Sequence, residues 1–358
     1  MGGRFTVRQD YRVKQLSPRS GFEALSVYDG VVGVCSIDLS DNTNLWGMPP
    51  SAKKALEEFS FADITRYPSA YSAELKESIA RYVGVDGSMI VTGCGSDDVL
   101  DSAIRAFGNS GGILASCDPT FSMIPVLSRI NGLAVTATSF DADGDISVDP
   151  LLSANADIIY ICSPNNPTGS SASVDRIETI ADEFNGLVIV DQAYAEYSAT
   201  SLTWLATRYS NVLIARTMSK AFGMAGLRVG YAIGNSALVN EVEKSRGPYK
   251  VGALGSAAAI AALENDLPWI EKIVDETLGV RSKFVARLEA LGYKPLPSDA
   301  NFVLIPMEAA FAVAKRLLQA GIGVRSFGNL PGIGNALRVT MAPWQMMEEF
   351  FSALEASA

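Results

Sequence analysis

Short, mostly apolar runs alternate with longer amphipathic stretches along the middle of the chain, and this alternation limits the possible folds more than any other feature. Six such runs lie between residues 89 and 233: MIVT, GILAS, ADIIYIC, GLVIVD, NVLIAR and LRVGYAI. A strand that is apolar on both faces has to be covered on both, as parallel strands are when helices connect them. The sequence therefore predicts an α/β architecture in which helices cover a mainly parallel sheet.

The pattern changes after residue 267 and predicts a second, smaller unit. Apolar residues recur every three or four positions over about residues 268–291, which indicates a long helix. Next come an expected strand over 301–305, a helix over 308–319, one short strand in GVRSF, another in ALRVTM and a terminal helix over 343–356. This order predicts an α+β unit.

These patterns divide the chain of 358 residues into three expected parts, in keeping with a length that suggests about two domains. Residues 51–265 are the predicted large domain and residues 266–358 the predicted C-terminal small domain. Residues 1–50 are expected to form an N-terminal arm and part of the small domain, with a strand that packs on the C-terminal unit.

The composition excludes several kinds of chemistry and partner. No histidine is present, which excludes an imidazole base, a histidine-containing triad and histidine metal ligands. The four cysteines are scattered without a C-x-x-C pair, so we expect no metal site and a reducing, cytoplasmic environment. A formal charge of −10 without a basic block disfavours nucleic acid and anionic membranes. A small molecule is the expected partner.

Polar side chains follow three of the predicted strands at the point where each ends. Asn166 lies in SPNNPTG, Asp191 ends the run VIVD with Tyr194 three residues later, and Lys220 follows NVLIAR. In open α/β sheets, ligands bind at the carboxyl ends of the strands. Each residue also has a plainer interpretation, as a turn, a helix cap or a solvated lysine.

Asp191 and Lys220 carry the chemistry in the sharper interpretation. A carboxylate at the end of an apolar strand is buried, so it needs a positive partner, and a protonated pyridine nitrogen is one. Tyr194 is then close enough to bond the hydroxyl oxygen of the same ring. Lys220 is flanked by hydroxyls and small residues, and a partly desolvated amine can form a Schiff base.

Further segments favour a ligand that carries an anion and a flat ring. The segment TGCGSDD, which contains Ser96 and Asp97, opens a predicted helix whose backbone N–H groups can bind a phosphate, although it lacks the third glycine of a dinucleotide fingerprint. An aromatic side chain can stack on the ring, and arginines and hydroxyls can bind anions. The candidates for these roles are Phe121, Thr217, Ser219, Arg228, Arg325 and Arg338.

Taken in order, these segments resemble the class I/II aminotransferases, which are fold-type-I pyridoxal-phosphate enzymes. The resemblance spans nearly the whole chain and rests on RYPSAYSAELKESIARYVGV, TGCGSDD, DPTF, SPNNPTG, VDQAYAEY, RTMSKAFGMAGLRVGY, KSRGPYKV, NFVLI and the pair Arg325 and Arg338. It implies a seven-stranded sheet in the large domain, pyridoxal 5'-phosphate as cofactor, and a cytoplasmic homodimer. It also implies transfer of an amino group from a small-molecule donor to a 2-oxo acid.

The same resemblance implies a role for each candidate residue. Lys220 holds the cofactor and moves a proton, Asp191 pairs with the ring nitrogen, and Asn166 and Tyr194 bind the ring oxygen while Phe121 stacks on the ring. The implied phosphate ligands are Ser96, Asp97, Thr217, Ser219, Arg228 and Tyr67, of which Tyr67 reaches in from the partner subunit. The implied residues on the substrate side are Arg325, Arg338 and Asn44.

Departures from the family pattern leave the substrate open. Gln192 stands where a glutamate is usual, Phe121 where a tyrosine is commoner, and the segment 41–47 lacks a usual Glu and Pro. Histidinol phosphate and 2-oxoglutarate, substrates in histidine biosynthesis, are the pair that the resemblance implies first. The alternatives are an aromatic or biosynthetic-cluster aminotransferase, a threonine-phosphate-type decarboxylase and a catalytically inactive cofactor-binding module.

Overall fold

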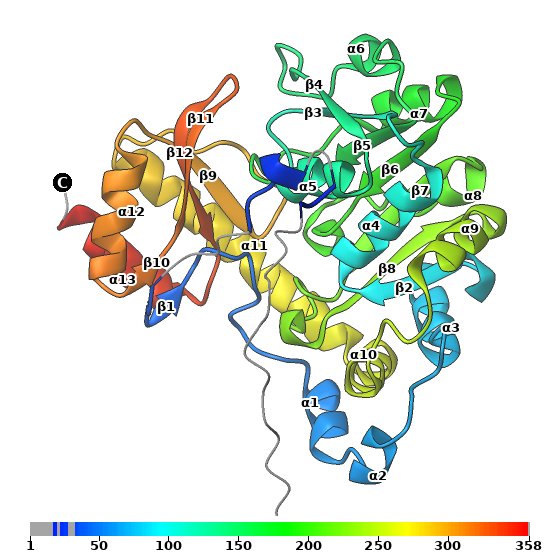
Figure 1. Cartoon of the computed structure of the whole chain (residues 1–358). Coiled ribbons are helices and arrows are strands. Elements are labelled where there is room, and N and C mark those ends of the chain that lie inside the picture. The colour runs from blue at the N-terminus through cyan, green and yellow to red at the C-terminus, as the bar shows by residue number, and fades with distance from the viewer. Residues whose placement is uncertain (1–16, 20–21, 28–32, 357–358) are drawn as a thin grey trace, which may run out of the picture.

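The computed structural model describes residues 17–19, 22–27 and 33–356, so much of the expected N-terminal arm and the last two residues lie outside the described part. Figure 1 shows a larger unit built on a central sheet and a smaller unit that carries the C-terminal helices. Within the described ranges, no helix is both long enough and apolar enough to cross a bilayer.

The six apolar runs all become strands of one seven-stranded sheet with the order β2-β8-β7-β6-β5-β3-β4. Strand β8 is antiparallel to both its neighbours, and the other pairs are parallel. The predicted α/β class with a mainly parallel sheet is confirmed. The strands are β2 (Ile90–Cys94), β3 (Ile113–Cys117), β4 (Ala134–Thr138), β5 (Ile158–Cys162), β6 (Leu187–Asp191), β7 (Val212–Thr217) and β8 (Val229–Gly234).

Helices cover both faces of this sheet (Figure 1). Along β6, Leu187 and Ile189 belong to one core cluster and Val188 and Val190 to another, because successive side chains of a strand point to opposite faces. The helices of the larger unit are α1 (Pro50–Glu57), α2 (Phe61–Ile64), α3 (Ala73–Val83), α4 (Ser96–Phe107), α5 (Met123–Ile130), α6 (Val148–Leu152), α7 (Val174–Glu183), α8 (Leu205–Arg208), α9 (Ser236–Arg246) and α10 (Ala253–Asn265).

The smaller unit contains a three-stranded antiparallel sheet with the order β11-β12-β9, and the long helix α11 connects it to the larger unit. Strand β1 (Ile37–Asp38) pairs in parallel with β10, so this part of the N-terminal segment lies against the C-terminal unit. The elements are α11 (Leu267–Ala290), β9 (Phe302–Pro306), α12 (Ala310–Gln319), β10 (Ile322–Gly323), β11 (Arg325–Leu330), β12 (Gly334–Thr340) and α13 (Trp344–Glu355).

One expectation for the smaller unit is wrong. The run GVRSF is not a single strand, because β10 ends at Gly323 and β11 begins at Arg325. The chain changes sheets between them, since β10 pairs with β1 whereas β11 pairs with β12. The domain boundaries at residues 50 and 265 stay predictions.

Candidate active site

A cavity of ≈ 310 Å³ lies at the carboxyl ends of the parallel strands, between the larger unit and the β11–β12 hairpin. Its walls come from segments that are far apart in the sequence, including residues 41–43 before α1 and Cys162 at the end of β5. Of the predicted site residues, the cavity brings together Ser96, Asp97, Phe121, Asn166, Asp191, Tyr194, Thr217, Ser219, Lys220, Arg228, Arg325 and Arg338.

Asp191 is the last residue of β6, and only 3% of its surface is exposed. Its Oδ2 accepts a hydrogen bond of 2.7 Å from the hydroxyl of Tyr160, and its Oδ1 accepts one of 3.0 Å from the backbone N–H of Ala193. Burial raises the pKa of Asp191 to about 6, although both hydrogen bonds act to lower it. Two neutral donors do not offset the burial of the charge, so the carboxylate favours a cationic ligand group.

Lys220 lies three residues beyond the end of β7 and reaches across to the N-terminal segment. Its Nζ donates a hydrogen bond of 2.9 Å to the backbone carbonyl of Asp41 and lies 5.8 Å from the ring centroid of Tyr194. Burial, and then the nearby charge of Arg338, lower the pKa of Lys220 to about 8. A larger fraction of this amine is therefore neutral and nucleophilic near neutral pH than for an ordinary lysine.

Tyr194 and Asn166 are both fixed by side chains from other segments. The Nδ2 of Asn42 donates a hydrogen bond of 2.9 Å to the Tyr194 hydroxyl, and Arg338 donates one to Oδ1 of Asn166. The sequence did not single out Asn42, which lies in the segment 41–47 that departs from the family pattern. Because Arg338 uses Oδ1 of Asn166, the Nδ2 group of this amide is the part that can donate to a ligand oxygen.

Asn44, the residue expected on the substrate side, is not among the residues that line the cavity. Its Nδ2 donates a hydrogen bond of 2.9 Å to the carbonyl of Ala221, and its Oδ1 accepts one from the N–H of Trp46. Asn44 thus ties the N-terminal segment to the loop that carries Lys220, and its substrate role stays a prediction.

One end of the cavity is built for an anion. Ser96 is the first residue of α4, and a helix N-terminus presents unpaired N–H groups. Nη2 of Arg228 lies 3.6 Å from Oδ2 of Asp97, and the hydroxyl of Thr217 donates to Oγ of Ser219. A positive arginine, two hydroxyls and a helix N-terminus together fit a phosphate monoester.

Arg325 and Arg338 lie directly opposite each other in the antiparallel pair β11–β12, so their side chains share one face of the hairpin, and both line the cavity. Like charges that face each other across a sheet are destabilising. Contacts to other segments nevertheless hold Arg338, which donates to Asn166 and to the backbone carbonyl of Ser40. Two opposed guanidinium groups favour an anionic ligand between them.

Tyr67 lies outside the cavity of this chain. Its side chain is 81% exposed and stacks on Tyr249, with the ring centroids 4.8 Å apart. Phe61 and Ile64 of α2 are exposed as well. Within one chain, therefore, the structure does not bring Tyr67 together with the other predicted phosphate ligands.

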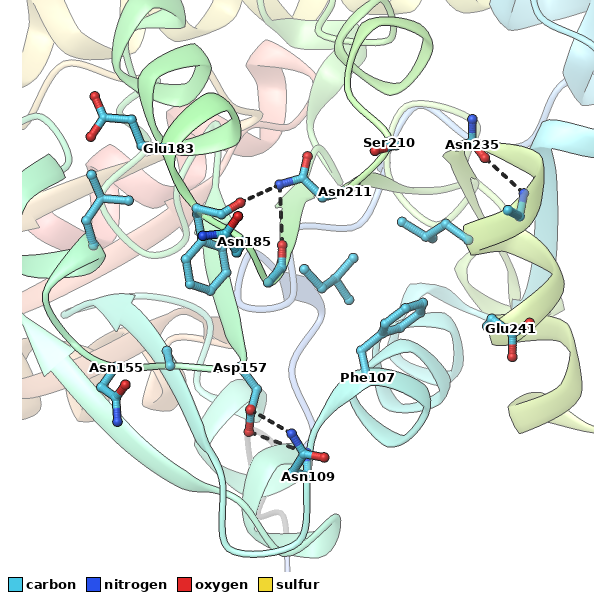
Figure 2. Close-up of a pocket in the computed structure, with 17 residues that line it drawn as sticks. Phe107, Asn109, Asn155, Asp157, Glu183, Asn185, Ser210, Asn211, Asn235 and Glu241 are labelled. Carbon is cyan, nitrogen blue, oxygen red and sulfur yellow. Dashed lines mark hydrogen bonds between the residues drawn. The ribbon is translucent and has the colours of Figure 1, made fainter.

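A larger hollow of ≈ 890 Å³ lies at the opposite, amino ends of the strands (Figure 2). Asn211 donates to the carbonyls of Ala181, Phe184 and Gly186. Asn109 donates to Asp157. These polar side chains thus already have hydrogen-bond partners within the protein. Among the described residues, neither Lys nor Arg lines this hollow. It therefore does not suit a phosphorylated ligand, unlike the cavity around Lys220.

The family model for aminotransferase class I and II matches residues 34–354. The chain belongs to this family. A histidinol-phosphate aminotransferase of Bacillus subtilis (strain 168) is 33% identical over 353 residues, covering 96% of this chain and 97% of the relative. One of Thermoanaerobacter sp. is 31% identical over 320 residues, covering 88% and 91%.

A solved structure of another family member has the same fold. Histidinol-phosphate aminotransferase from Sinorhizobium meliloti, in complex with pyridoxal-5'-phosphate, superposes with a TM-score of 0.87 at 25% identity, covering 96% of this chain and 97% of the other. The aminotransferase described here is thus a fold-type-I, pyridoxal-phosphate-dependent enzyme.

The aminotransferase cavity fits this cofactor on the chemistry of its own donor groups. The buried carboxylate of Asp191 suits a protonated ring nitrogen, and the amine of Lys220 suits an aldehyde. The N-terminus of α4 with Arg228 suits the phosphate. All three groups line the same cavity, as binding of one cofactor molecule requires.

Proposed function

We propose that this aminotransferase moves the amino group of L-histidinol phosphate to 2-oxoglutarate, a step of histidine biosynthesis. The observation that carries the choice of substrates is the opposed pair Arg325 and Arg338 in the cavity. Both substrates are acidic, one through a phosphate and the other through a distal carboxylate. One arginine pair can bind either group in turn, and the names of the relatives in B. subtilis, Thermoanaerobacter and S. meliloti support the same substrate.

When bound, pyridoxal phosphate supplies an electron sink that stabilises negative charge on the α-carbon of the substrate. Asp191 binds the ring nitrogen and favours its protonated form because a buried carboxylate stabilises a nearby cation. Asn166 and Tyr194 would bind the ring oxygen, and Phe121, which lines the same cavity, would contact the ring. Lys220 is the proton carrier, since its neutral Nζ takes the proton from the α-carbon of the substrate.

The phosphate of the cofactor is held at the amino end of α4. The backbone N–H groups of Ser96 and Asp97 would donate to it, and Thr217, Ser219 and Arg228, which line the same cavity, would complete the site on one chain. Binding of the phosphate at this end would fix the position of the ring relative to Lys220, so the amine and the group with which it reacts are already close together.

We further propose that the enzyme is a cytoplasmic homodimer in which Tyr67 completes the partner's phosphate site. In support, the side chains of Phe61, Ile64 and Tyr67, on α2 and just after it, are exposed, and Tyr67 stacks on Tyr249, which is exposed as well. Apolar side chains that gather at one place on a surface mark interaction sites. The described cysteines are free thiols, which agrees with a reducing compartment.

The experiment that tests the proposed function follows the visible absorbance of the cofactor-loaded protein during addition of L-histidinol phosphate without a 2-oxo acid. We expect the absorbance to be lost, and 2-oxoglutarate to restore it. If histidinol phosphate leaves the spectrum unchanged, the substrate assignment is wrong; aromatic amino acids and threonine phosphate are then tested, the latter with detection of released CO₂.

A further inference from the structure

Tyr160 is a buried phenol in β5, and none of the roles assigned above uses it. Every residue of β5 is buried, and the strand is otherwise made of Ile and Cys. A buried tyrosine needs a partner for its hydroxyl group. Tyr160 finds this partner on the neighbouring strand, because its Oη lies 2.7 Å from Oδ2 of Asp191.

This contact fixes the orientation of the Asp191 carboxylate. Tyr160 donates to Oδ2, while the backbone N–H of Ala193 donates to Oδ1. The carboxylate therefore cannot turn about its Cβ–Cγ bond without loss of at least one hydrogen bond. Each oxygen accepts about two hydrogen bonds, so both keep capacity toward the cavity that Asp191 lines.

We propose that Tyr160 is a positioning residue for the cofactor ring. Its hydroxyl holds the Asp191 carboxylate in one orientation and favours the ionised form, and both would be needed to bind a protonated ring nitrogen. This inference rests on the proposed function. Tyr160 is not among the residues that line the cavity, so it acts through Asp191 alone. Its hydroxyl contributes to the acidity of Asp191 as well as to the direction of the carboxylate.

The charges around Asp191 support this role. Burial raises the pKa of Asp191 to about 6, the hydrogen bonds from Tyr160 and Ala193 lower it, Asp97 raises it and Lys220 lowers it. The titratable groups that face Asp191 are Tyr160 and Cys162 from β5, Asp97 from α4, Lys220 from the loop after β7, and Tyr194 just beyond its own strand.

Tyr160 stays a donor over the whole working pH range. Burial, and then the charge of Asp191, raise the pKa of its phenol well above the ordinary value. Burial likewise raises the pKa of Cys162, which lies directly opposite Asp191 in the parallel pair. Of the three side chains Tyr160, Cys162 and Asp191, Asp191 is consequently the one that changes charge near neutral pH, and loss of the Tyr160 hydroxyl raises the pH at which it ionises.

The test compares two ligands in wild-type protein and in the variant Tyr160→Phe. One ligand is pyridoxal 5'-phosphate, and the other is its analogue with a ring C–H in place of the ring nitrogen. We expect the substitution to weaken binding of pyridoxal phosphate by roughly tenfold to hundredfold, the range of hydrogen bonds to charged groups. Binding of the analogue changes by less than about twofold, since Asp191 has no N–H to accept from.

Equal weakening of both ligands, or of neither, overturns the proposal, because Tyr160 would then act on the fold in general or not at all. The matched control is Tyr197→Phe, which removes a phenol hydroxyl that is equally buried but lies in the core cluster on the opposite face. It should leave both affinities unchanged. If wild-type protein binds no pyridoxal phosphate, the proposed function fails rather than this inference.

A second readout is the pH dependence of the absorbance of the bound cofactor. We expect its acid transition to move to higher pH in Tyr160→Phe, because the carboxylate loses a hydrogen bond that favours its ionised form. If the phenylalanine variant does not fold, 3-fluorotyrosine incorporated at position 160 provides a stronger donor and moves the transition the other way. An unmoved transition in the folded variants contradicts the role of Tyr160.

Discussion

Burial moves the pKa values of Asp191 and Lys220 toward neutrality from opposite sides, to about 6 and about 8. Asp191 is therefore ionised above about pH 6, and Lys220 is neutral above about pH 8. The pair that the proposed cofactor site requires, an anionic carboxylate and a neutral amine, becomes the main form as pH rises through about 8. Both groups return to ordinary behaviour only if the cavity opens to water.

We predict that the rate at which the cofactor-free protein takes up pyridoxal phosphate rises with pH and levels off above about pH 8. The rise follows deprotonation of Lys220, whose pKa burial lowers. Stopped-flow absorbance at several pH values measures this rate. A rate that keeps rising beyond pH 10 indicates an ordinary, solvated lysine and contradicts the burial described here.

The substitution Lys220→Ala should abolish transamination and the visible absorbance of covalently held cofactor. Removal of a general base costs about 10² to 10⁴ in rate, and loss of the covalent link adds to this. Lys244→Ala is the control, because Lys244 is exposed and forms its ion pair with Glu241, away from the cavity. An active Lys220→Ala variant would place the chemistry on another residue.

The sequence identified these ionisable residues because Asp191 ends an apolar strand, where an unpaired charge is costly, and Lys220 closely follows another. Asn42 could not be identified in this way, because it lies in an irregular segment without periodicity. The residue that it contacts, Tyr194, is 152 residues away in the sequence. Tyr160 could not be identified either, but because its surroundings in the sequence are regular and apolar. A tyrosine inside the apolar run IIYIC is indistinguishable from a core residue until the strand order places it beside Asp191.

At the scale of elements, the buried strands were predictable, including β2 at one edge of the sheet, whereas β4 at the other edge was not. Strand β4 is only half-buried, and its sequence AVTAT is too polar to stand out as an apolar run, as is usual for a strand at the edge of a sheet. The seven-stranded sheet followed from the family resemblance, whereas the apolar runs alone gave six strands. Strand β10 is separate from β11 because β10 pairs with β1, and the local sequence pattern does not reveal a pairing between such distant segments.

Gly230 of β8 packs so closely against the turn between β2 and α4 that it leaves no room for a side chain. A Cβ atom there would overlap the backbone of Gly95 and Ser96, where the helix begins. We expect Gly230→Ala to lower the free energy of unfolding by about 1 to 3 kcal/mol and to weaken pyridoxal-phosphate binding. Thermal unfolding and a binding titration measure both effects. Gly226→Ala is the control, since its Cβ meets no atom within 4 Å; equal effects of the two changes would contradict the steric account.

The opposed arginines of the β11–β12 hairpin predict a separation of stability from substrate binding. In Arg325→Gln, relief of like-charge repulsion should leave the free energy of unfolding unchanged or raise it by up to about 1 kcal/mol. The KM for both acidic substrates should rise by roughly tenfold to hundredfold, because a charged hydrogen bond is lost. Steady-state kinetics and thermal unfolding test this. Unchanged KM values for both substrates would remove Arg325 from the substrate site.

At the scale of the whole molecule, the exposed patch around α2 predicts that a second copy completes the phosphate site. Ile64→Glu should convert the dimer to a monomer and weaken cofactor binding, since a buried charge opposes association and Tyr67 of the partner subunit is lost. Light scattering after gel filtration measures the mass. Phe311→Glu on α12 of the smaller unit serves as the control, because its side chain is also exposed. A fully active monomer contradicts the shared site.

The N-terminal segment reaches the site only together with the last strand of the smaller unit. Arg338 donates to the carbonyl of Ser40, and Thr340 donates to that of Leu39. The same segment supplies the carbonyl of Asp41 that holds Lys220. Contacts between such distant segments form late, because loop closure has to precede them. On the ribosome, the larger unit can pack while synthesis continues, but the pocket closes only after β12 has been made, so a product that stops before β12 contains Lys220 without the segments that hold it in place.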